Sequence, residues 1–284
     1  MAIAEKIAVL GAGVMGTGIA MNLAAFGYEV ILKDIDENIL LSAREKISKD
    51  LRMLKMMRPD YKELELDQLL SRIAFNQSYQ DFEELDFVIE NVSEKWETKE
   101  KLYKELREVC KNEAIFCVNT SCISITKIGA LMSHPENIIG MHFMNPVPLK
   151  EMVELVKGYH TSTETIDKAK AFLKSIKKSP VLVNDYPGFV ANRLSHLFMN
   201  EAAFLIQDQV ASPKDVDMIF KKGYGHSMGP LETADLIGLD TVVDSLEILY
   251  QNYQDSKFRC CPLLRKMVDA GLLGKKSGEG FYKY

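Results

Sequence analysis

The chain has 284 residues, of which 47% are hydrophobic and 26% charged, and its formal net charge is −5. This composition excludes a disordered chain, a collagen-like repeat and a small disulfide-stapled domain. The acidic balance also excludes a nucleic-acid binder whose whole surface is basic. The length predicts one large domain or two medium ones. The five cysteines follow no metal-binding spacing, which favours reduced thiols in a cytoplasmic protein without a metal site.

An uncharged run from Ile7 to Tyr28 is long enough to be considered as a membrane span. Five glycines interrupt this run, and glycine is unfavourable inside a helix. Three shorter elements explain it better: a buried strand over residues 6–10, a helix over residues 14–26 and a second strand over residues 28–34. We therefore expect a β-α-β unit at the start of the chain and no membrane segment.

The alternation of strands and helices continues along the chain. Helices are predicted over residues 36–57, 65–71 and 95–111, and strands over residues 86–90, 114–118, 138–143, 151–156 and 181–184. Such alternation is typical of an α/β fold with a doubly wound, Rossmann-type, mostly parallel sheet. After Asp185 only helices are predicted, over residues 189–210, 213–222, 238–253 and 262–271. We expect residues 1–185 to bind a nucleotide and residues 186–284 to form a smaller all-α domain.

The segment from Gly11 to Gly16, with Gly13 inside it, follows the first predicted strand and opens the first predicted helix. In a dinucleotide-binding turn the first glycine permits the tight turn, the second lets the backbone approach a pyrophosphate, and the third lets the helix pack closely on the sheet. The positive end of the helix then faces the phosphates, which makes Val14 and Met15 further cofactor contacts.

Asp34 indicates which nucleotide this turn binds. It lies 23 residues after Gly11, at the end of the second predicted strand, where a carboxylate accepts both hydroxyls of a ribose. Asp36 follows closely and no arginine stands beside it, so a ribose phosphate would be repelled. The sequence therefore predicts NAD and not NADP as the cofactor.

His142 stands out among the five histidines because it ends a predicted strand, where open α/β sheets bind their ligands. Glu154 follows 12 residues later, after a turn, and this spacing allows its carboxylate to lie beside the imidazole. Such a pair suits the oxidation of an alcohol, because the hydroxyl proton needs a base that works near neutral pH. From the spacing alone, a structural histidine explains the pattern almost as well.

Segments spread along the whole chain resemble the L-3-hydroxyacyl-CoA dehydrogenases, the short-chain family that includes bacterial 3-hydroxybutyryl-CoA dehydrogenases. They are residues 11–16, 119–121, 140–148, 187–193, 228–230 and 278–282. The resemblance implies an NAD-dependent oxidoreductase that interconverts a short-chain 3-hydroxyacyl-CoA, such as 3-hydroxybutyryl-CoA, and its 3-oxo form. It also implies a homodimer, with the helical domain contributing substrate contacts and most of the interface, and neither a nucleic acid nor a membrane as partner.

The same resemblance assigns roles by position. It makes His142 the catalytic base and Glu154 its paired carboxylate, while Ser121 contacts the 3-oxygen of the substrate and Asn192 is the active-site asparagine. Further contacts with the cofactor are implied at Glu90, Lys95, Asn119 and Asn145. Simpler explanations stay open, because Ser121 and Asn192 could be helix N-caps and Glu90 an acid at a strand end.

The segment from Arg44 to Lys62 concerns the carrier of the acyl group. It holds seven basic residues against three acidic ones. It is either a solvated helix face or a binding site for an anionic carrier. Family members contact CoA here through a serine and a lysine, whose positions fall on Asp50 and Met57. The replacements suggested by the sequence are Lys55 and Arg58. An acid near the phosphates of CoA is unfavourable, so an acyl carrier protein is the alternative carrier.

Two other classes of protein share parts of this pattern. A non-enzymatic NAD-binding protein is disfavoured because Ser121, His142, Glu154 and Asn192 are all present. The 3-hydroxyisobutyrate and 6-phosphogluconate dehydrogenase group has a similar nucleotide motif but uses a catalytic lysine near an asparagine after the nucleotide domain. Residues 187–193 contain Asn192 and no lysine, which disfavours that group.

Overall fold

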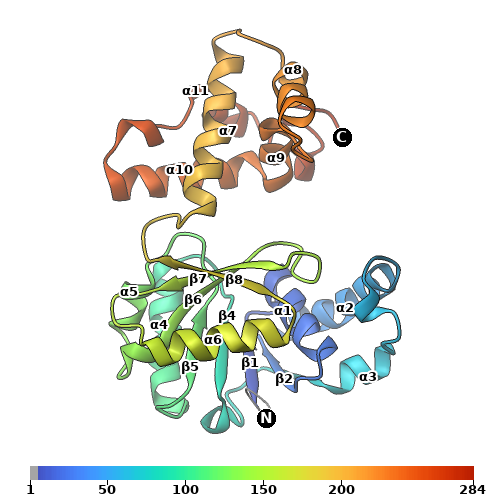
Figure 1. The fold of residues 1–284 in the computed structure, drawn as a ribbon, viewed down its shortest axis with the longest axis vertical. Coiled ribbons are helices and arrows are strands. Elements are labelled where there is room, and N and C mark those ends of the chain that lie inside the picture. The colour runs from blue at the N-terminus through green and yellow to red at the C-terminus, as the bar shows by residue number, and fades with distance from the viewer. Residues whose placement is uncertain (1–5) are drawn as a thin grey trace. The chain divides into compact units, whose positions relative to one another are not determined.

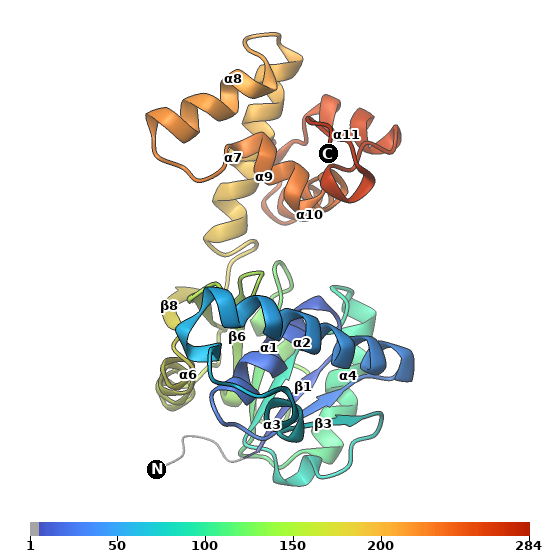
Figure 2. The ribbon, with the colours of Figure 1, turned by 90° about the vertical axis from the view of Figure 1, so that its right-hand side faces the viewer.

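The structure, a computed structural model, describes residues 6–284, so residues 1–5 of the predicted nucleotide domain lie outside the described residues. Contacts within the chain separate it into two units, with the boundary between Asp185 and Tyr186 (Figures 1 and 2). Within residues 6–284, no helix reaches the length and apolar character needed to cross a membrane.

The first unit is built on one eight-stranded sheet in the order β3-β2-β1-β4-β5-β6-β7-β8. The strands are β1 (Ile7–Leu10), β2 (Val30–Lys33), β3 (Ile73–Asn76), β4 (Phe87–Glu90), β5 (Ile115–Val118), β6 (Ile138–Phe143), β7 (Met152–Lys157) and β8 (Ser179–Asn184). Neighbouring strands are parallel except β6 and β7, which are antiparallel. The predicted doubly wound, mostly parallel sheet is confirmed. The order reverses between β1 and β4, and such sheets bind ligands outside the carboxyl ends of the strands at this point.

Helices cover both faces of this sheet (Figure 1). They are α1 (Val14–Ala25), α2 (Glu37–Met57), α3 (Leu66–Ser71), α4 (Trp96–Val109), α5 (Ile125–Gly129) and α6 (Thr163–Ser175). Because side chains alternate along a strand, Val9, Ile89 and Cys117 join the core formed with α1, α2 and α6. Residues between them face α4, where the rings of Tyr103 and Phe116 meet edge-on at 6.4 Å.

Two elements of the first unit are absent from the sequence prediction. The edge strand β3 has only its first residue, Ile73, buried, and its apolar run is only three residues long, from Ile73 to Phe75. Such a short run is a weak signal for a strand. Helix α6 begins after Ser162, whose side chain accepts a hydrogen bond from the Thr165 N–H. This cap and the buried positions Ile166 and Leu173 are the signals that identify such a helix in a sequence.

The second unit is helical, as predicted, and has a core of its own. Its helices are α7 (Ala191–Gln207), α8 (Pro213–Met218), α9 (Pro230–Ile237), α10 (Leu239–Tyr253) and α11 (Pro262–Asp269). Met199, Leu239, Leu246 and Leu264 are buried together in it. The helix predicted over residues 213–222 is confirmed, as α8 followed by a π-helical turn, Ile219–Gly223, whereas α9 is absent from the prediction.

Two of the three glycines of the segment from Gly11 to Gly16, which ends inside α1, are required by the fold itself. Gly11 has a φ of +86°, and a Cβ there would lie 2.7 Å from the carbonyl oxygen of Asn91. A Cβ on Gly16 would lie 1.8 Å from the carbonyl oxygen of Gly11. A Cβ on Gly13, in contrast, would meet no atom of the described chain within 4 Å. Packing therefore explains Gly11 and Gly16 but not Gly13.

Replacing Gly16 with alanine should lower the free energy of unfolding by about 3 kcal/mol, because the new methyl group collides with backbone that cannot move aside. Gly13→Ala is the matched control and should cost less than about 1 kcal/mol, the scale of a changed helix N-cap. Urea unfolding of both variants measures the two effects. Equal stability of the variants would show that the turn does not pack as described.

Candidate active site

The turn after β1 and the end of β2 together form a polar site. The Asp34 carboxylate accepts a hydrogen bond of 2.7 Å from the Ala12 N–H, and the Gly11 N–H donates to the Lys33 carbonyl oxygen at 2.8 Å. Helix α1 starts directly after this turn, and its N-cap, Gly13, has no side chain to cap it. Val14 in its first turn is 60% exposed. The positive end of α1 is thus open to an anion.

This arrangement fits the pyrophosphate and ribose of a dinucleotide. Since protein packing does not require Gly13, close approach of a ligand backbone explains the missing side chain there. Asp34 lies beside that position, with its second oxygen accepting from the Asp36 N–H at 3.2 Å. Its carboxylate oxygens are the acceptors that ribose hydroxyls need.

His142 and Glu154 are direct cross-strand partners in the antiparallel pair of β6 and β7. His142 Nδ1 lies 2.8 Å from Glu154 Oε2, and the two side chains are 9% and 3% exposed. Because a carboxylate only accepts hydrogen bonds, Nδ1 carries the proton, and Nε2 is the basic nitrogen. The buried setting strengthens this hydrogen bond.

Ser121 lies in the loop after β5, and its Oγ is 3.2 Å from His142 Nε2. The structure therefore brings three of the predicted residues into one line, from Ser121 through His142 to Glu154. The helix cap at this place is a different residue, because Ser124 Oγ accepts from the Lys127 N–H at the start of α5. The simpler explanation of Ser121 as an N-cap is therefore wrong.

Asn192 lies in the second unit, inside the first turn of α7. The N-cap of that helix is Val190, so the explanation of Asn192 as a cap is also wrong. Its carbonyl oxygen lies 2.9 Å from Nδ1 of His196. Its contact with the substrate stays a prediction.

Asn119 directly follows β5, and Asn145 lies two residues after the end of β6. The Asn119 side chain donates to Asn91 Oδ1 at 2.7 Å and accepts from the Phe143 N–H at 3.1 Å, which ties the ends of β4, β5 and β6 together. Asn145 forms a cis peptide bond with Pro146 directly after β6. Both are placed at the edge where ligands bind, and their contacts with a cofactor stay predictions.

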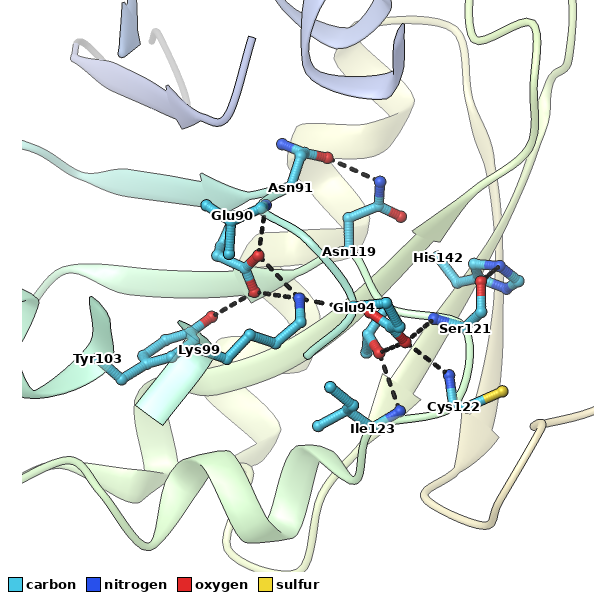
Figure 3. Close-up of polar contacts among 12 residues, drawn as sticks. Glu90, Asn91, Glu94, Lys99, Tyr103, Asn119, Ser121, Cys122, Ile123 and His142 are labelled. Atoms are coloured by element: carbon cyan, nitrogen blue, oxygen red, sulfur yellow. Dashed lines mark hydrogen bonds and ion pairs between the residues drawn. The ribbon is translucent and has the colours of Figure 1, made fainter. Parts of the chain in front are cut away.

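Glu90 and Lys95, which the resemblance assigns to the nicotinamide side of the cofactor, have different surroundings. Glu90 is fully buried at the end of β4, with its carboxylate oxygens 2.8 and 2.7 Å from Lys99 Nζ, and burial raises its pKa (Figure 3). Lys95 is the exposed N-cap residue of α4. Glu94 and Lys99 are absent from the sequence prediction. Glu94 accepts a hydrogen bond from the Ser121 N–H, and Lys99 lies beside Glu94 (Figure 3). The sequence does carry a signal for Lys99, because its spacing from Tyr103 and Leu106 places all three on one side of a helix, the side that is buried in α4.

Comparison with known proteins places both units in one group. Residues 6–186 match the family model described as "3-hydroxyacyl-CoA dehydrogenase, NAD binding domain", and residues 188–284 match its "C-terminal domain". The chain belongs to the 3-hydroxyacyl-CoA dehydrogenase family. This confirms the resemblance drawn from the sequence.

Relatives match the chain over nearly its full length. A protein of Deinococcus radiodurans named "Probable 3-hydroxybutyryl-CoA dehydrogenase" is 44% identical and covers 98% of this chain and 100% of its own. The "3-hydroxybutyryl-CoA dehydrogenase" of Bradyrhizobium diazoefficiens is 41% identical, covering 100% and 96% of the two chains. The crystal structure of (S)-3-hydroxybutyryl-CoA dehydrogenase from Ralstonia eutropha is similar with a TM-score of 0.93, 38% identity and 99% coverage of both chains.

In this member of the family, the two candidate carrier contacts are held in ion pairs within the first unit. Lys55 Nζ lies 3.2 Å from Glu65, and the Arg58 guanidinium lies 3.3 Å from Asp60 and 3.1 Å from Glu151. A phosphate would therefore have to share these cations with carboxylates. The role of both residues in carrier binding stays a prediction.

The turn between β6 and β7 is held by a buried lysine that the sequence analysis did not single out. Lys178 is 4% exposed, and its Nζ donates to the carbonyl oxygens of Val147 at 2.6 Å and Lys150 at 2.8 Å. Burial, together with the nearby Arg58 charge, lowers the pKa of Lys178 to about 8. Because this turn joins the strands that carry His142 and Glu154, Lys178 stabilises the turn that brings these strands together.

Lys178→Met should lower the free energy of unfolding, because two buried carbonyl oxygens lose their donor. Between pH 8 and 10.5 the unfolded chain holds the lysine proton more tightly than the folded chain does, so the stability due to this lysine rises with pH in that range. The stability difference between wild type and variant should thus grow by about 2 kcal/mol between about pH 7 and pH 9.5. Urea unfolding at both pH values measures it, and a constant difference would contradict the assignment.

Proposed function

We propose that this protein interconverts a short-chain 3-hydroxyacyl-CoA, such as 3-hydroxybutyryl-CoA, and its 3-oxoacyl-CoA, with NAD as the cofactor. The observation that carries the proposal is the buried pair of His142 and Glu154 with Ser121 at the second imidazole nitrogen. Full-length relatives named 3-hydroxybutyryl-CoA dehydrogenase support the choice of a short acyl chain.

Each side chain of the site has a proposed task in the oxidation. His142 Nε2 takes the proton of the 3-hydroxyl group, and Glu154 stabilises the imidazolium that forms. Ser121 donates a hydrogen bond to the 3-oxygen of the substrate, and Asn192 contacts the substrate from the second unit. In the reduction, the imidazolium returns the proton to the 3-oxygen. Bound NAD would supply the acceptor for the hydride that leaves C3 of the substrate. In the reverse reaction, bound NADH would supply the hydride donor.

The proposed cofactor site begins at the glycine turn, where the N–H groups of Val14 and Met15 meet the phosphates and Asp34 binds the ribose hydroxyls. The choice of NAD over NADP is supported by Lys33, the nearest base in sequence to Asp34. Lys33 is buried beneath the ring of Tyr79, 4.3 Å from its centroid, and burial lowers its pKa. It is thus poorly placed to neutralise a ribose phosphate.

Other contacts with the cofactor are proposed at the carboxyl ends of β4, β5 and β6. Asn119, Asn145 and Lys95 lie at or near these ends and have polar groups for the nicotinamide half. Glu90 can contribute there only through its neighbours, because its carboxylate is fully buried. The protein is further proposed to form a homodimer through the second unit, as the resemblance implies, which sedimentation velocity tests. A cytoplasmic location is proposed because the spacing of the five cysteines favours reduced thiols.

His142→Gln should lower kcat by about 10²- to 10⁴-fold, the usual weight of a general base, because glutamine cannot take the hydroxyl proton. Binding of NAD, measured by quenching of protein fluorescence, should change little. His134→Gln is the matched control, since His134 is a half-exposed surface residue paired with Glu136, and its kcat should equal that of the wild type. Near-normal turnover of His142→Gln would refute the assigned base.

The carrier of the acyl group is the finer part of the proposal, and CoA is our first choice. The opposing observation is that Asp50 occupies the position where a CoA contact is expected, although its carboxylate is paired with Lys46 at 2.8 Å. The end of α2 nearby exposes Met53, Met56 and Met57. An acyl carrier protein with the same hydroxyacyl group remains the alternative.

Steady-state rates decide between these partners. The 3-hydroxybutyryl thioesters of CoA and of an acyl carrier protein should be compared, each with NAD and with NADP. We expect the highest kcat/KM with the CoA ester and NAD. A higher value with the carrier-protein ester would select the alternative carrier, a higher value with NADP would refute the role of Asp34, and no turnover of either thioester would refute the proposed reaction.

A further inference from the structure

We propose that this protein also turns over 3-hydroxyacyl and 3-oxoacyl thioesters whose carrier has neither a nucleotide nor a phosphate, such as thioesters of N-acetylcysteamine. The inference rests on the proposed function and extends it to a second class of substrate. Its basis is the end of α2, which presents thioether side chains and carboxylate-paired cations near the carboxyl end of β6, the strand of His142.

The end of α2 lies beside the turn that follows the strand of His142. Glu151 directly precedes β7, and the register pairs Val153 with Phe143, so Glu151 lies beyond the carboxyl end of β6. The guanidinium of Arg58, the C-cap residue of α2, is 3.1 Å from the Glu151 carboxylate. A substrate that is bound at His142 and extends over this turn therefore meets the last turns of α2.

Most cations of the segment from Arg44 to Lys62 are already neutralised by carboxylates. Four of its seven basic residues form ion pairs: Lys46 with Asp50 at 2.8 Å, Lys49 with Glu45 at 3.8 Å, Lys55 with Glu65 at 3.2 Å and Arg58 with Asp60 at 3.3 Å. A phosphate is attracted only weakly to such a cation, because the carboxylate beside it repels the phosphate. The segment thus offers less to an anionic carrier than its sequence indicates.

The three remaining cations do not lie on the side of α2 that carries Met57. Arg44 is near the start of the helix, with its guanidinium 5.8 Å from the centroid of the Phe75 ring. Arg52 precedes Met57 by five residues, which places it about 140° away around the axis of an α-helix. Lys62 is exposed and lies beyond α2, after the 3-10 turn Pro59–Tyr61. The side of Met57 is therefore not a cationic one.

Two methionines form this side of α2. Met53 and Met57 are four residues apart, so they are neighbours along the helix surface, and they are 46% and 56% exposed. Adjacent exposed apolar residues are typical of binding surfaces, and the flexible thioether adapts to apolar groups of different shape. The end of α2 therefore suits the uncharged chain next to a thioester better than it suits phosphates.

The reaction itself needs only the acyl end of the substrate. His142 and Ser121 face the 3-oxygen in the proposed reaction, and Glu154 acts through His142. Remote parts of a substrate contribute to kcat/KM only through the binding energy that they supply. Because this side of α2 is apolar, removal of the nucleotide and its phosphates should lower kcat/KM by less than about tenfold.

The first experiment compares the oxidation of three substrates with NAD: 3-hydroxybutyryl-CoA, 3-hydroxybutyryl-pantetheine and 3-hydroxybutyryl-N-acetylcysteamine. We expect their kcat/KM values to lie within about tenfold of one another, with most of any difference in KM. A larger loss on removal of the nucleotide would overturn the inference. If none of the three is turned over, the proposed function itself fails, whereas turnover of the CoA ester alone overturns only the extension to uncharged carriers.

The second experiment adds an unpaired cation to the end of α2. Met57→Lys places an ammonium beside Met53 and should raise the ratio of kcat/KM for the CoA ester to that for the N-acetylcysteamine ester by about fivefold. Because exposed charges are screened by salt, raising the ionic strength from about 0.05 M to about 0.5 M should remove most of this gain. Leu41→Lys is the matched control, since Leu41 is equally exposed, at 56%, but lies near the start of α2, about 24 Å away along its axis.

A raised ratio in Met57→Lys and an unchanged ratio in Leu41→Lys are the expected results. An unchanged ratio in Met57→Lys would show that the phosphates of CoA bind away from this helix, and it would overturn the role given to α2. Both positions are exposed, so both variants should unfold at nearly the temperature of the wild type, which circular dichroism measures.

Discussion

The antiparallel pairing of β6 and β7 is the constraint on which the site depends. A parallel neighbour would need a long crossover, whereas the short turn after β6 brings the chain straight back along it. The register places His142 and Glu154 directly opposite each other. A slip by one residue would move Glu154 to the other face of the sheet, among the apolar contacts of α6. Backbone pairing thus determines which nitrogen of the imidazole is basic.

The parallel part of the sheet supplies the other half of the site through its strand ends. The carboxyl ends of β1, β4 and β5 carry the glycine turn, Asn91 and Asn119. Polar groups at these ends cannot pair within the ladders, and they pair with one another instead: Asn119 joins Asn91 to the backbone of Phe143. The buried Lys99 continues this pattern from α4.

The sequence predicts much of this fold because its signals are local. Apolar runs mark the inner strands, the glycine turn marks the nucleotide site, and His142 is recognisable at a strand end. The edge strand β3 has a run of only three apolar residues, of which only Ile73 is buried. The pairing of β7 with β6 and the ion pair of Glu90 with Lys99 connect distant segments, so spacing along the chain shows only that they are possible.

Glu90 and Lys95, the cofactor contacts that the resemblance predicts, show the same limit in detail. Four residues separate Glu90 from Glu94, and four separate Lys95 from Lys99, so each pair is close in sequence. Lys99 is buried whereas Lys95 is exposed, and Glu94 contacts the Ser121 loop. These differences arise only when α4 packs on the sheet. A match by position in the sequence therefore does not reveal which of these side chains are buried and which contact the loop.

We propose that the carboxyl edge of this sheet assembles a site for hydride transfer from C3 of a hydroxyacyl thioester. Incubation of the protein with NAD and 3-hydroxybutyryl-CoA that carries deuterium at C3, followed by mass spectrometry and NMR to locate the label, tests this proposal. One deuterium at C4 of the reduced nicotinamide for each 3-oxo product formed is the expected result. Product formation with the deuterium released to water, or no product at all, would contradict the claim.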